Sequence, residues 1–299
     1  MLVTPFALAY ITSRPAGALI FTSTRLEKTY RGRLLDAILS GKVRPVKLET
    51  PIAVIVRISA ARGARPGGVV AFDADGTLWS GDVGDDFFHG VLRTGRIEPE
   101  AIARMRALAA AERVDAPDGG PPLAAALYNA YREGRVPEES LCEMVAYVCA
   151  GWTQAEVEAL AAEVVVRDRL SERMQVETVQ VLEWTRREQI EAFVVSASPF
   201  APVLAGARAL GFDADHVLGA TTIASGGRLS AEIERPVPYG PGKVLRLLQR
   251  IGSRPLYAAF GDNVFDIPLL RSATIPVAVR PKARLVERAA EVPGLVEMR

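Results

Sequence analysis

Residues 69–79 read Val69-Val70-Ala71-Phe72-Asp73-Ala74-Asp75-Gly76-Thr77-Leu78-Trp79, and this stretch decides the fold. A short apolar run of this kind is typical of a buried strand. The run ends abruptly in two acids, Asp73 and Asp75. In open α/β sheets, ligands bind outside the carboxyl ends of the strands. The stretch therefore predicts a strand that carries two carboxylates to a binding crevice.

Strands and helices alternate in the second half of the chain. Apolar strand-like runs occupy residues 192–195, 256–260 and 275–279, and helical patterns occupy 176–187, 202–210, 242–251 and 283–290. Such alternation predicts an α/β fold with a Rossmann-like parallel sheet and helices on both faces. Residues 217–218 and 221–224 look extended, and Gly226-Gly227 predicts a turn between strands.

Between the first strand and this alternating part lies a segment with helical periodicity. Apolar residues recur at helix spacing over 97–111, 122–132, 138–150 and 154–165. We expect a small four-helix cap over residues 83–175, inserted into a core made of 66–82 and 176–299.

The first 65 residues differ from the rest in charge. They hold eleven Lys/Arg and three acids, a net charge of +8, whereas residues 66–299 carry −7. Few aromatic residues lie among these basic ones, so we expect no nucleic-acid binding. We predict that residues 1–65 form a poorly ordered basic extension; a transit peptide is the alternative.

The sequence also bears on the compartment. No apolar run is long enough to span a membrane, and the N-terminus lacks the basic start of a secretory signal. Cys142 and Cys149 would lie about 10.5 Å apart along a helix, which is too far for a disulfide. We therefore expect reduced thiols and a cytoplasmic protein without a membrane partner; the oligomeric state stays open.

Three strands end in polar residues: Asp73 with Asp75, Ser196, and Asp262 with Asp266. Two carboxylates facing one crevice can divide labour between a nucleophile and a proton donor and acceptor. Capping acids in a glycine turn are the alternative for the first pair. Asp73 and Asp262 offer the oxygen ligands that Mg²⁺ prefers, although Asp262 and Asp266 also fit a turn that caps a helix.

Lysine is rare outside the basic segment. Residues 66–299 contain 23 arginines but only Lys243 and Lys282. Lys243 follows Gly242 at the start of a predicted helix, where an ammonium can offset charge on Asp73 and on a phosphate. The hydroxyls of Thr77 and Ser196, and the backbone N–H groups after Ser196, are further candidates for binding phosphate oxygens.

These elements in this order resemble the haloacid dehalogenase superfamily of phosphohydrolases, over about residues 68–299. The resemblance implies that Asp73 is the nucleophile and Asp75 the general acid and base. It implies phosphate binding by Thr77, Ser196, Ala197 and Lys243. It also implies Mg²⁺ held by Asp73, the Asp75 backbone carbonyl and Asp262, with Asp266 in support.

The helical segment resembles the cap of the phosphoserine-phosphatase-like branch. Asp82 stands where phosphoserine phosphatases have glutamate, and Phe265 stands where the family has asparagine. We expect Asp82 to face the substrate, and we also consider His89 for that role, with a structural histidine as the alternative.

The expected activity is Mg²⁺-dependent hydrolysis of a small-molecule phosphate ester, either phosphoserine or a phosphocholine-like compound, through an aspartyl phosphate. Phosphotransfer to an alcohol and an inactive phospholigand-binding module are the alternatives. Carbon–halogen hydrolysis needs neither Asp75 nor Asp262, so both residues argue against it.

Overall fold

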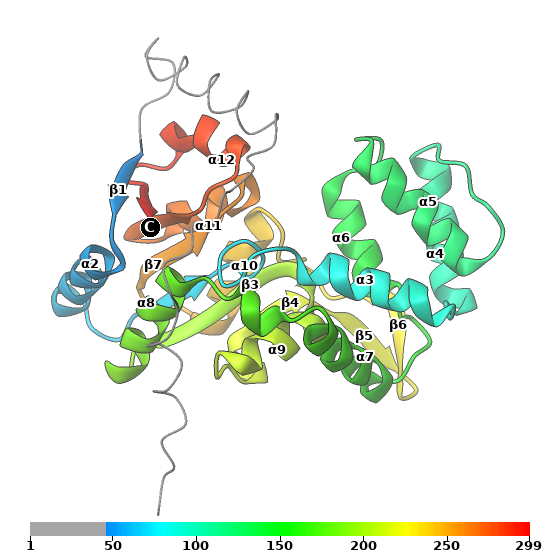
Figure 1. Ribbon diagram of the computed structural model, residues 1–299, viewed down its shortest axis with the longest axis horizontal. Coiled ribbons are helices and arrows are strands. Elements are labelled where there is room, and N and C mark those ends of the chain that lie inside the picture. Colours follow the sequence, from blue (N-terminus) through cyan, green and yellow to red (C-terminus); the bar gives the residue numbers. More distant parts are fainter. Residues whose placement is uncertain (1–45) are drawn as a thin grey trace, which may run out of the picture. The chain divides into compact units, whose positions relative to one another are not determined.

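The computed structural model describes residues 46–299, which are built around one sheet of seven parallel strands (Figure 1). In order across the sheet, the strands are β1 (Lys47–Glu49), β9 (Val296–Met298), β8 (Ile275–Val279), β7 (Leu256–Gly261), β2 (Val69–Phe72), β3 (Glu191–Pro199) and β4 (Val217–Ala220). The predicted Rossmann-like α/β sheet is confirmed. The strand that carries Asp73 is central, because β2 pairs with both β3 and β7.

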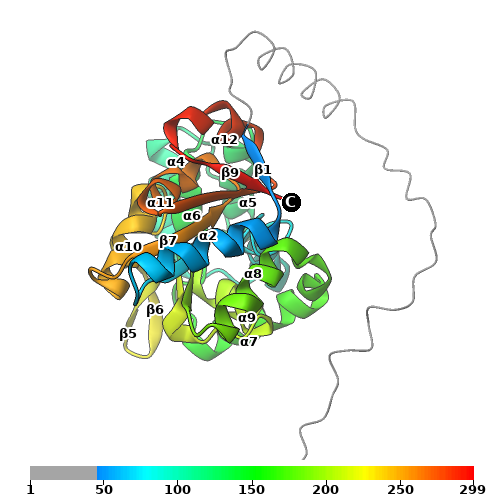
Figure 2. The ribbon, with the colours of Figure 1, turned by 90° about the vertical axis from the view of Figure 1, so that its left-hand side faces the viewer.

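Helices cover both faces of the sheet (Figure 2). One face packs against α2 (Pro51–Ala64), α8 (Val176–Arg187) and α9 (Phe200–Ala209). The other packs against α10 (Pro241–Ile251), α11 (Ile267–Ser272) and α12 (Ala283–Glu287). Successive strand residues point to opposite faces, so Val70 and Phe72 belong to the first layer and Val69 and Ala71 to the second. All four residues of β2 are buried, which explains its unbroken apolar run.

The boundary predicted at residue 65 is wrong for the part of the basic segment that the structure describes. β1 pairs in parallel with β9 at the edge of the sheet, and α2 buries Val54 and Ile58 in the core. The helix begins as its sequence allows, since the Thr50 side chain accepts a hydrogen bond from the backbone N–H of Ala53. Residues 1–45 lie outside the described residues, and the extension predicted there stays a prediction.

Five α-helices, one more than predicted, lie between β2 and α8. They are α3 (Val83–Thr94), α4 (Pro99–Ala111), α5 (Gly120–Arg132), α6 (Glu138–Tyr147) and α7 (Gln154–Arg167). We call residues 83–175 the helical insert; α3 to α6 lie to the right of the sheet in Figure 1. The unpredicted helix is α3, which contains Gly84 and Gly90 and so has weak helix propensity.

A hairpin from the second half of the chain belongs to the core of the helical insert. It consists of β5 (Thr222–Ser225) and β6 (Arg228–Ile233), joined at the predicted turn, where Gly226 and Gly227 both have positive φ. Leu229 is buried with the insert helices, and it exchanges two backbone hydrogen bonds with residues 151 and 152, of 2.7 and 2.8 Å. The core of the helical insert is therefore completed by a second, separate segment of the chain.

Within residues 46–299, no helix combines the length and the apolar character needed to cross a membrane. Cys142 and Cys149 are both free thiols, as the spacing predicts.

Candidate active site

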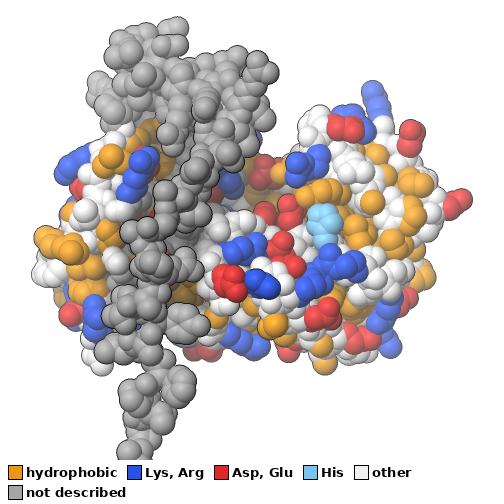
Figure 3. Space-filling model, viewed as in Figure 1, with side chains coloured by type: hydrophobic (Ala, Val, Ile, Leu, Met, Phe, Trp, Pro, Cys, Tyr) orange, Lys and Arg blue, Asp and Glu red, His pale blue; other side chains and the backbone are white. Residues whose placement is uncertain are grey.

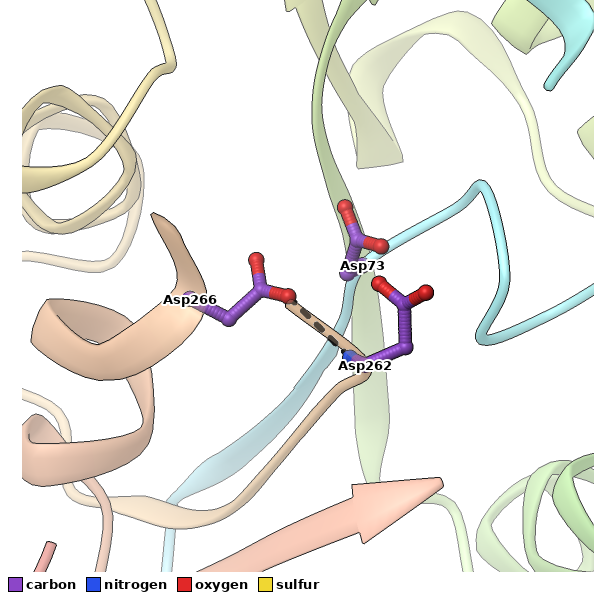
Figure 4. Close-up of side chains that lie close together, drawn as sticks. All are labelled: Asp73, Asp262 and Asp266. Carbon is purple, nitrogen blue, oxygen red and sulfur yellow. Dashed lines mark hydrogen bonds between the residues drawn. The ribbon is translucent and has the colours of Figure 1, made fainter. Parts of the chain in front are cut away.

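Three buried carboxylates converge at the carboxyl edge of the sheet. Asp73 directly follows β2, Asp262 directly follows β7, and Asp266 lies one turn further along the chain. One oxygen from each lies within 4.8 Å of the other two, and Figure 4 shows the three side chains facing a common point. The structure thus brings together residues that the sequence separates by almost two hundred positions.

Lys243 is the buried counter-ion of this carboxylate cluster. Its Nζ lies 2.6 Å from Asp73 Oδ1 and 2.5 Å from Asp266 Oδ1. It reaches the cluster from the first turn of α10. A buried ammonium shared by two carboxylates keeps both in fixed positions, since none of the three charges is stable unpaired in the interior.

Asp266 is held chiefly by its own loop. Its Oδ2 accepts a hydrogen bond from the backbone N–H of Asp262, at 3.1 Å (Figure 4). The same oxygen accepts a second one from the backbone N–H of Asn263, at 2.9 Å. The turn that follows β7 is therefore stabilised by the same carboxylate that receives Lys243.

Burial and mutual repulsion raise the pKa of carboxylates in the cluster and so favour their protonated forms. Burial raises the pKa of Asp73 well above its ordinary value; the neighbouring Asp266 raises it further, and Lys243 opposes both. Burial also raises the pKa of Asp262 to about 6, although the Lys282 ammonium acts to lower it. A bound cation would relieve this cost, because it favours the ionised carboxylates.

Asp75 lines the same pocket but lies outside the cluster. Its carboxylate accepts three hydrogen bonds, from Trp79 Nε1 at 2.8 Å, the backbone N–H of Val83 at 2.7 Å and Ser198 Oγ at 2.6 Å. The sequence predicts that Asp73 and Asp75 face one crevice, and both line this pocket. Because the chain turns after β2, the Asp75 carboxylate is held by the start of α3 and the end of β3.

The predicted phosphate-binding residues fall into two groups. Ser196 and Ala197 line the pocket, and Ser196 Oγ accepts a hydrogen bond of 3.1 Å from the backbone N–H of Ser198. Thr77 is fully buried and is not part of the pocket wall; its hydroxyl donates to Asp73 Oδ2 at 3.3 Å. The structure thus places Thr77 behind Asp73, where it orients that carboxylate.

The carboxylate cluster forms the base of a pocket of about 430 Å³ between the core and the helical insert. On the face shown in Figure 3, acidic side chains gather in the hollow between these two parts, with basic side chains beside them. Residues beyond the cluster give the pocket an outer wall that is partly aromatic and partly charged; they include Tyr131, Glu138, Cys142, Tyr239, Phe265 and Arg284.

The two residues expected to face the substrate, Asp82 and His89, have different outcomes. Asp82 lines the pocket and also caps α3, because its Oδ1 accepts a hydrogen bond from the backbone N–H of Asp85. His89 does not line the pocket. It is exposed, its ring packs edge-on against Phe88 and Tyr128, and its Nδ1 lies 2.8 Å from the carbonyl oxygen of Asp85. His89 is therefore a structural histidine, the alternative given above, and the expectation that it faces the substrate was wrong.

Sequence reasoning missed two residues that contact the acids of the site. Ser198 donates to Asp75, and Lys282 Nζ lies 3.0 Å from Asp262 Oδ2. A signal existed for both: Ser198 is two residues beyond Ser196, and Lys282 is the second of only two lysines after residue 65.

A sequence profile of the haloacid dehalogenase-like hydrolases matches residues 70–271, more than half of the chain. The chain belongs to the haloacid dehalogenase-like hydrolase family. The matched residues of this haloacid dehalogenase-like hydrolase include the whole carboxylate cluster and Lys243, so the predicted superfamily is confirmed.

Solved structures with the same fold include two proteins whose function is unknown. One, from Bordetella pertussis Tohama I, is 24% identical, with a TM-score of 0.60 over 77% of this hydrolase and 97% of that chain. Another, from Anaerococcus prevotii DSM 20548, is 14% identical, with a TM-score of 0.58 over 80% and 87% of the two chains. A substrate-bound phosphoserine phosphatase aligns more loosely, with 15% identity and a TM-score of 0.46 over 77% and 92%. A search of curated proteins finds no match.

Proposed function

We propose that this hydrolase is a Mg²⁺-dependent phosphatase that cleaves a small-molecule phosphomonoester through an aspartyl phosphate on Asp73. The observation that carries the proposal is the buried cluster of Asp73, Asp262 and Asp266 around Lys243, at the base of a pocket. A carboxylate beside a fixed cation, with two further acids at hand, fits nucleophilic attack on phosphorus better than simple ligand binding.

The donor set of the cluster suits a magnesium ion. All three groups are carboxylates, which are hard oxygen ligands, and neither histidine of the chain lines the pocket. Asp73 and Asp262 would hold the ion together with the Asp75 backbone carbonyl, and Asp266 would orient the loop. Bound there, the ion would supply positive charge to the phosphoryl group in transfer.

The chain's own residues account for the bond changes. An oxygen of Asp73 attacks phosphorus in line, and the bond from phosphorus to the leaving oxygen breaks while Asp75 gives that oxygen a proton. Asp75 then takes a proton from a water molecule, whose oxygen bonds to phosphorus as the bond to Asp73 breaks. Alcohol and phosphate leave, and both carboxylates return to their starting state. The hydrogen bonds from Trp79, Val83 and Ser198 hold Asp75 in place for both proton transfers.

The outer pocket supports a leaving group with a cationic nitrogen. Glu138 lines this part and forms no ion pair within residues 46–299. It lies close to Tyr131 and Tyr239: burial is the main cause of the raised pKa of each tyrosine, and the charge of Glu138 is the second. An unpaired carboxylate beside aromatic rings suits an ammonium group. Arg284, whose guanidinium carbon lies 5.4 Å from the centre of the Phe265 ring, is suited to a substrate carboxylate.

Substitution of Asp73 tests the reaction. Asp73→Asn should abolish Mg²⁺-dependent cleavage of p-nitrophenyl phosphate with an unchanged circular dichroism spectrum, whereas Asp118→Asn, at an exposed position of the insert, should retain it. Wild-type turnover in Asp73→Asn would refute the nucleophile assignment. Phosphoryl transfer to an added alcohol in place of water would favour the phosphotransferase. Phosphate binding without turnover of any ester would favour the inactive module.

Two further variants test the substrate. Glu138→Gln should raise KM for both phosphocholine and phosphoserine and leave KM for glycerol phosphate unchanged. Arg284→Met should raise KM for phosphoserine alone, since only that substrate carries a carboxylate. If each variant changed the KM of all three esters by the same factor, or changed none of them, these contacts would be contradicted.

A further inference from the structure

Among the residues that the structure describes, Lys282 contacts the carboxylate cluster directly and yet has no part in the proposed chemistry. Its Nζ lies 3.0 Å from Asp262 Oδ2, and it lines the pocket. Its side chain is 57% exposed, whereas that of Asp262 is 3% exposed. The lysine thus reaches from solvent-filled space to a buried carboxylate that is a candidate metal ligand.

The two lysines of the site differ in how easily their side chains can leave their carboxylate partners. Lys243 is buried and bonded to two carboxylates, so any movement would leave charges unpaired in the interior. Lys282 has one carboxylate partner and an exposed side chain, so its ammonium can exchange Asp262 for another anion in the pocket at little desolvation cost.

The backbone that carries Lys282 is anchored, so any movement is confined to the side chain. The backbone N–H of Lys282 donates to the carbonyl oxygen of Asp262 at 2.7 Å. Two residues earlier, Arg280 binds both oxygens of Glu177, at 2.6 and 3.2 Å. The loop between β8 and α12 is therefore tied to the core at residue 280 and at the backbone of the lysine itself.

We propose that Lys282 exchanges partners: it pairs with Asp262 when no metal is bound, and it contacts the phosphoryl oxygens of the substrate once Asp262 coordinates the divalent cation. The proposal deepens the proposed function and rests on it. A divalent cation and an ammonium at one carboxylate repel each other, while a phosphate dianion in the pocket attracts both. Metal and phosphate should consequently strengthen each other's binding, and Lys282 carries part of that coupling.

The coupling has a defined sign for each ligand. Without Lys282, the metal no longer competes with an ammonium for Asp262, so Mg²⁺ alone should bind more tightly. Phosphate loses a cationic partner in the metal-bound protein and should bind more weakly. Thermodynamic linkage requires that Mg²⁺ change the affinity for phosphate by the same factor as phosphate changes the affinity for Mg²⁺. Without Lys282, both of these effects must therefore decrease by one common factor.

Isothermal titration calorimetry on the full chain measures both affinities. In Lys282→Met, the Kd for Mg²⁺ should fall severalfold, and the Kd for inorganic phosphate at saturating Mg²⁺ should rise by about tenfold, a typical coupling factor. Lys282→Arg, which keeps the charge, should stay close to the wild type. Lys47→Met is the matched control, because Lys47 Nζ lies 2.9 Å from Glu49 Oε1 with side-chain exposures of 76% and 6%, and that pair lies on the edge strand β1.

The outcomes separate this inference from the proposed function. Unchanged or weaker Mg²⁺ binding in Lys282→Met, or an unchanged phosphate Kd, overturns the exchange. Lack of Mg²⁺ binding by the wild type overturns the proposed function itself. Circular dichroism of each variant confirms that the comparison is between folded proteins.

Discussion

Gly76 faces the carboxylate of Asp262 so closely that a Cβ at position 76 would lie 2.1 Å from Asp262 Oδ2. Gly76 also has a φ of +83°, in the left-handed region that side chains disfavour. The glycine after Asp75 therefore serves two ends: it allows the turn after β2 and leaves room for the carboxylate that follows β7.

Substitution of this glycine should damage the site beyond its effect on the backbone. We expect Gly76→Ala to lose about 1 to 2 kcal/mol of stability from the left-handed conformation, and also to lose Mg²⁺ affinity, because Asp262 must move. Gly95→Ala is the control, since Gly95 has a φ of +70° and a methyl group on its Cα would meet nothing within 4 Å. Thermal unfolding and Mg²⁺ titration of both variants measure the two effects. Equal Mg²⁺ affinity in the two variants would show that the close approach is unimportant.

Loss of Lys243 should destabilise the metal-free protein in a pH-dependent way. Lys243→Met leaves buried carboxylates without their cation, which costs about 3 kcal/mol or more at pH 8. The pKa of Asp73 is already raised by burial, so its ionised form opposes folding above the pKa of the unfolded chain. The deficit should therefore shrink as the pH falls from 8 to 5, and Mg²⁺ should recover part of it. Urea unfolding at both pH values tests this, and a deficit that grows at pH 5 would contradict it.

The Glu177–Arg280 pair should stabilise the fold only above mildly acidic pH. Burial acts to raise the pKa of Glu177, but the hydrogen bonds and the charge of Arg280 together with a backbone hydrogen bond outweigh it, and the pKa lies below its ordinary value. A lowered pKa gives stability that is present above the unfolded-state value of about 4.3 and is lost as the pH falls through the folded-state value. Glu177→Gln should cost about 1 kcal/mol at pH 7 and less at pH 3 than at pH 7. Glu172→Gln, whose exposed carboxylate lies 3.9 Å from Arg169, should change stability at neither pH.

Helix α2 provides a test of the corrected N-terminal boundary. Ile58 is fully buried in the core, whereas Ile52 in the same helix is 72% exposed. We expect Ile58→Ala to cost about 2 to 4 kcal/mol and Ile52→Ala to cost less than about 0.5 kcal/mol. Urea unfolding measures both. Equal effects of the two substitutions would mean that α2 does not pack on the sheet.

The sequence located those parts of the site that depend on local pattern. Asp73, Ser196 and Asp262 each follow an apolar run of the sequence, and parallel strands bring their carboxyl ends to one edge. Lys243 was noticeable because lysine is rare in this part of the chain. These signals come from neighbouring residues, so they could be read before the fold was known.

Other features depend on contacts between distant segments. β1 has only three residues, and its partner β9 is near the opposite end of the chain, so no local period marks it. The contact between Lys282 and Asp262 depends on a loop whose course is set by Arg280 and Glu177. The outward direction of His89 depends on how α3 packs against α5, where its ring meets Tyr128, and helical spacing does not reveal that packing.

The hairpin of β5 and β6 has a consequence for engineering and for evolution. Because Leu229 and its neighbours complete the interior of the insert, a graft of residues 83–175 onto a related scaffold would leave an apolar surface uncovered. A viable chimera must exchange both pieces together, and lineages that diversified their substrates would be expected to vary these two stretches in concert.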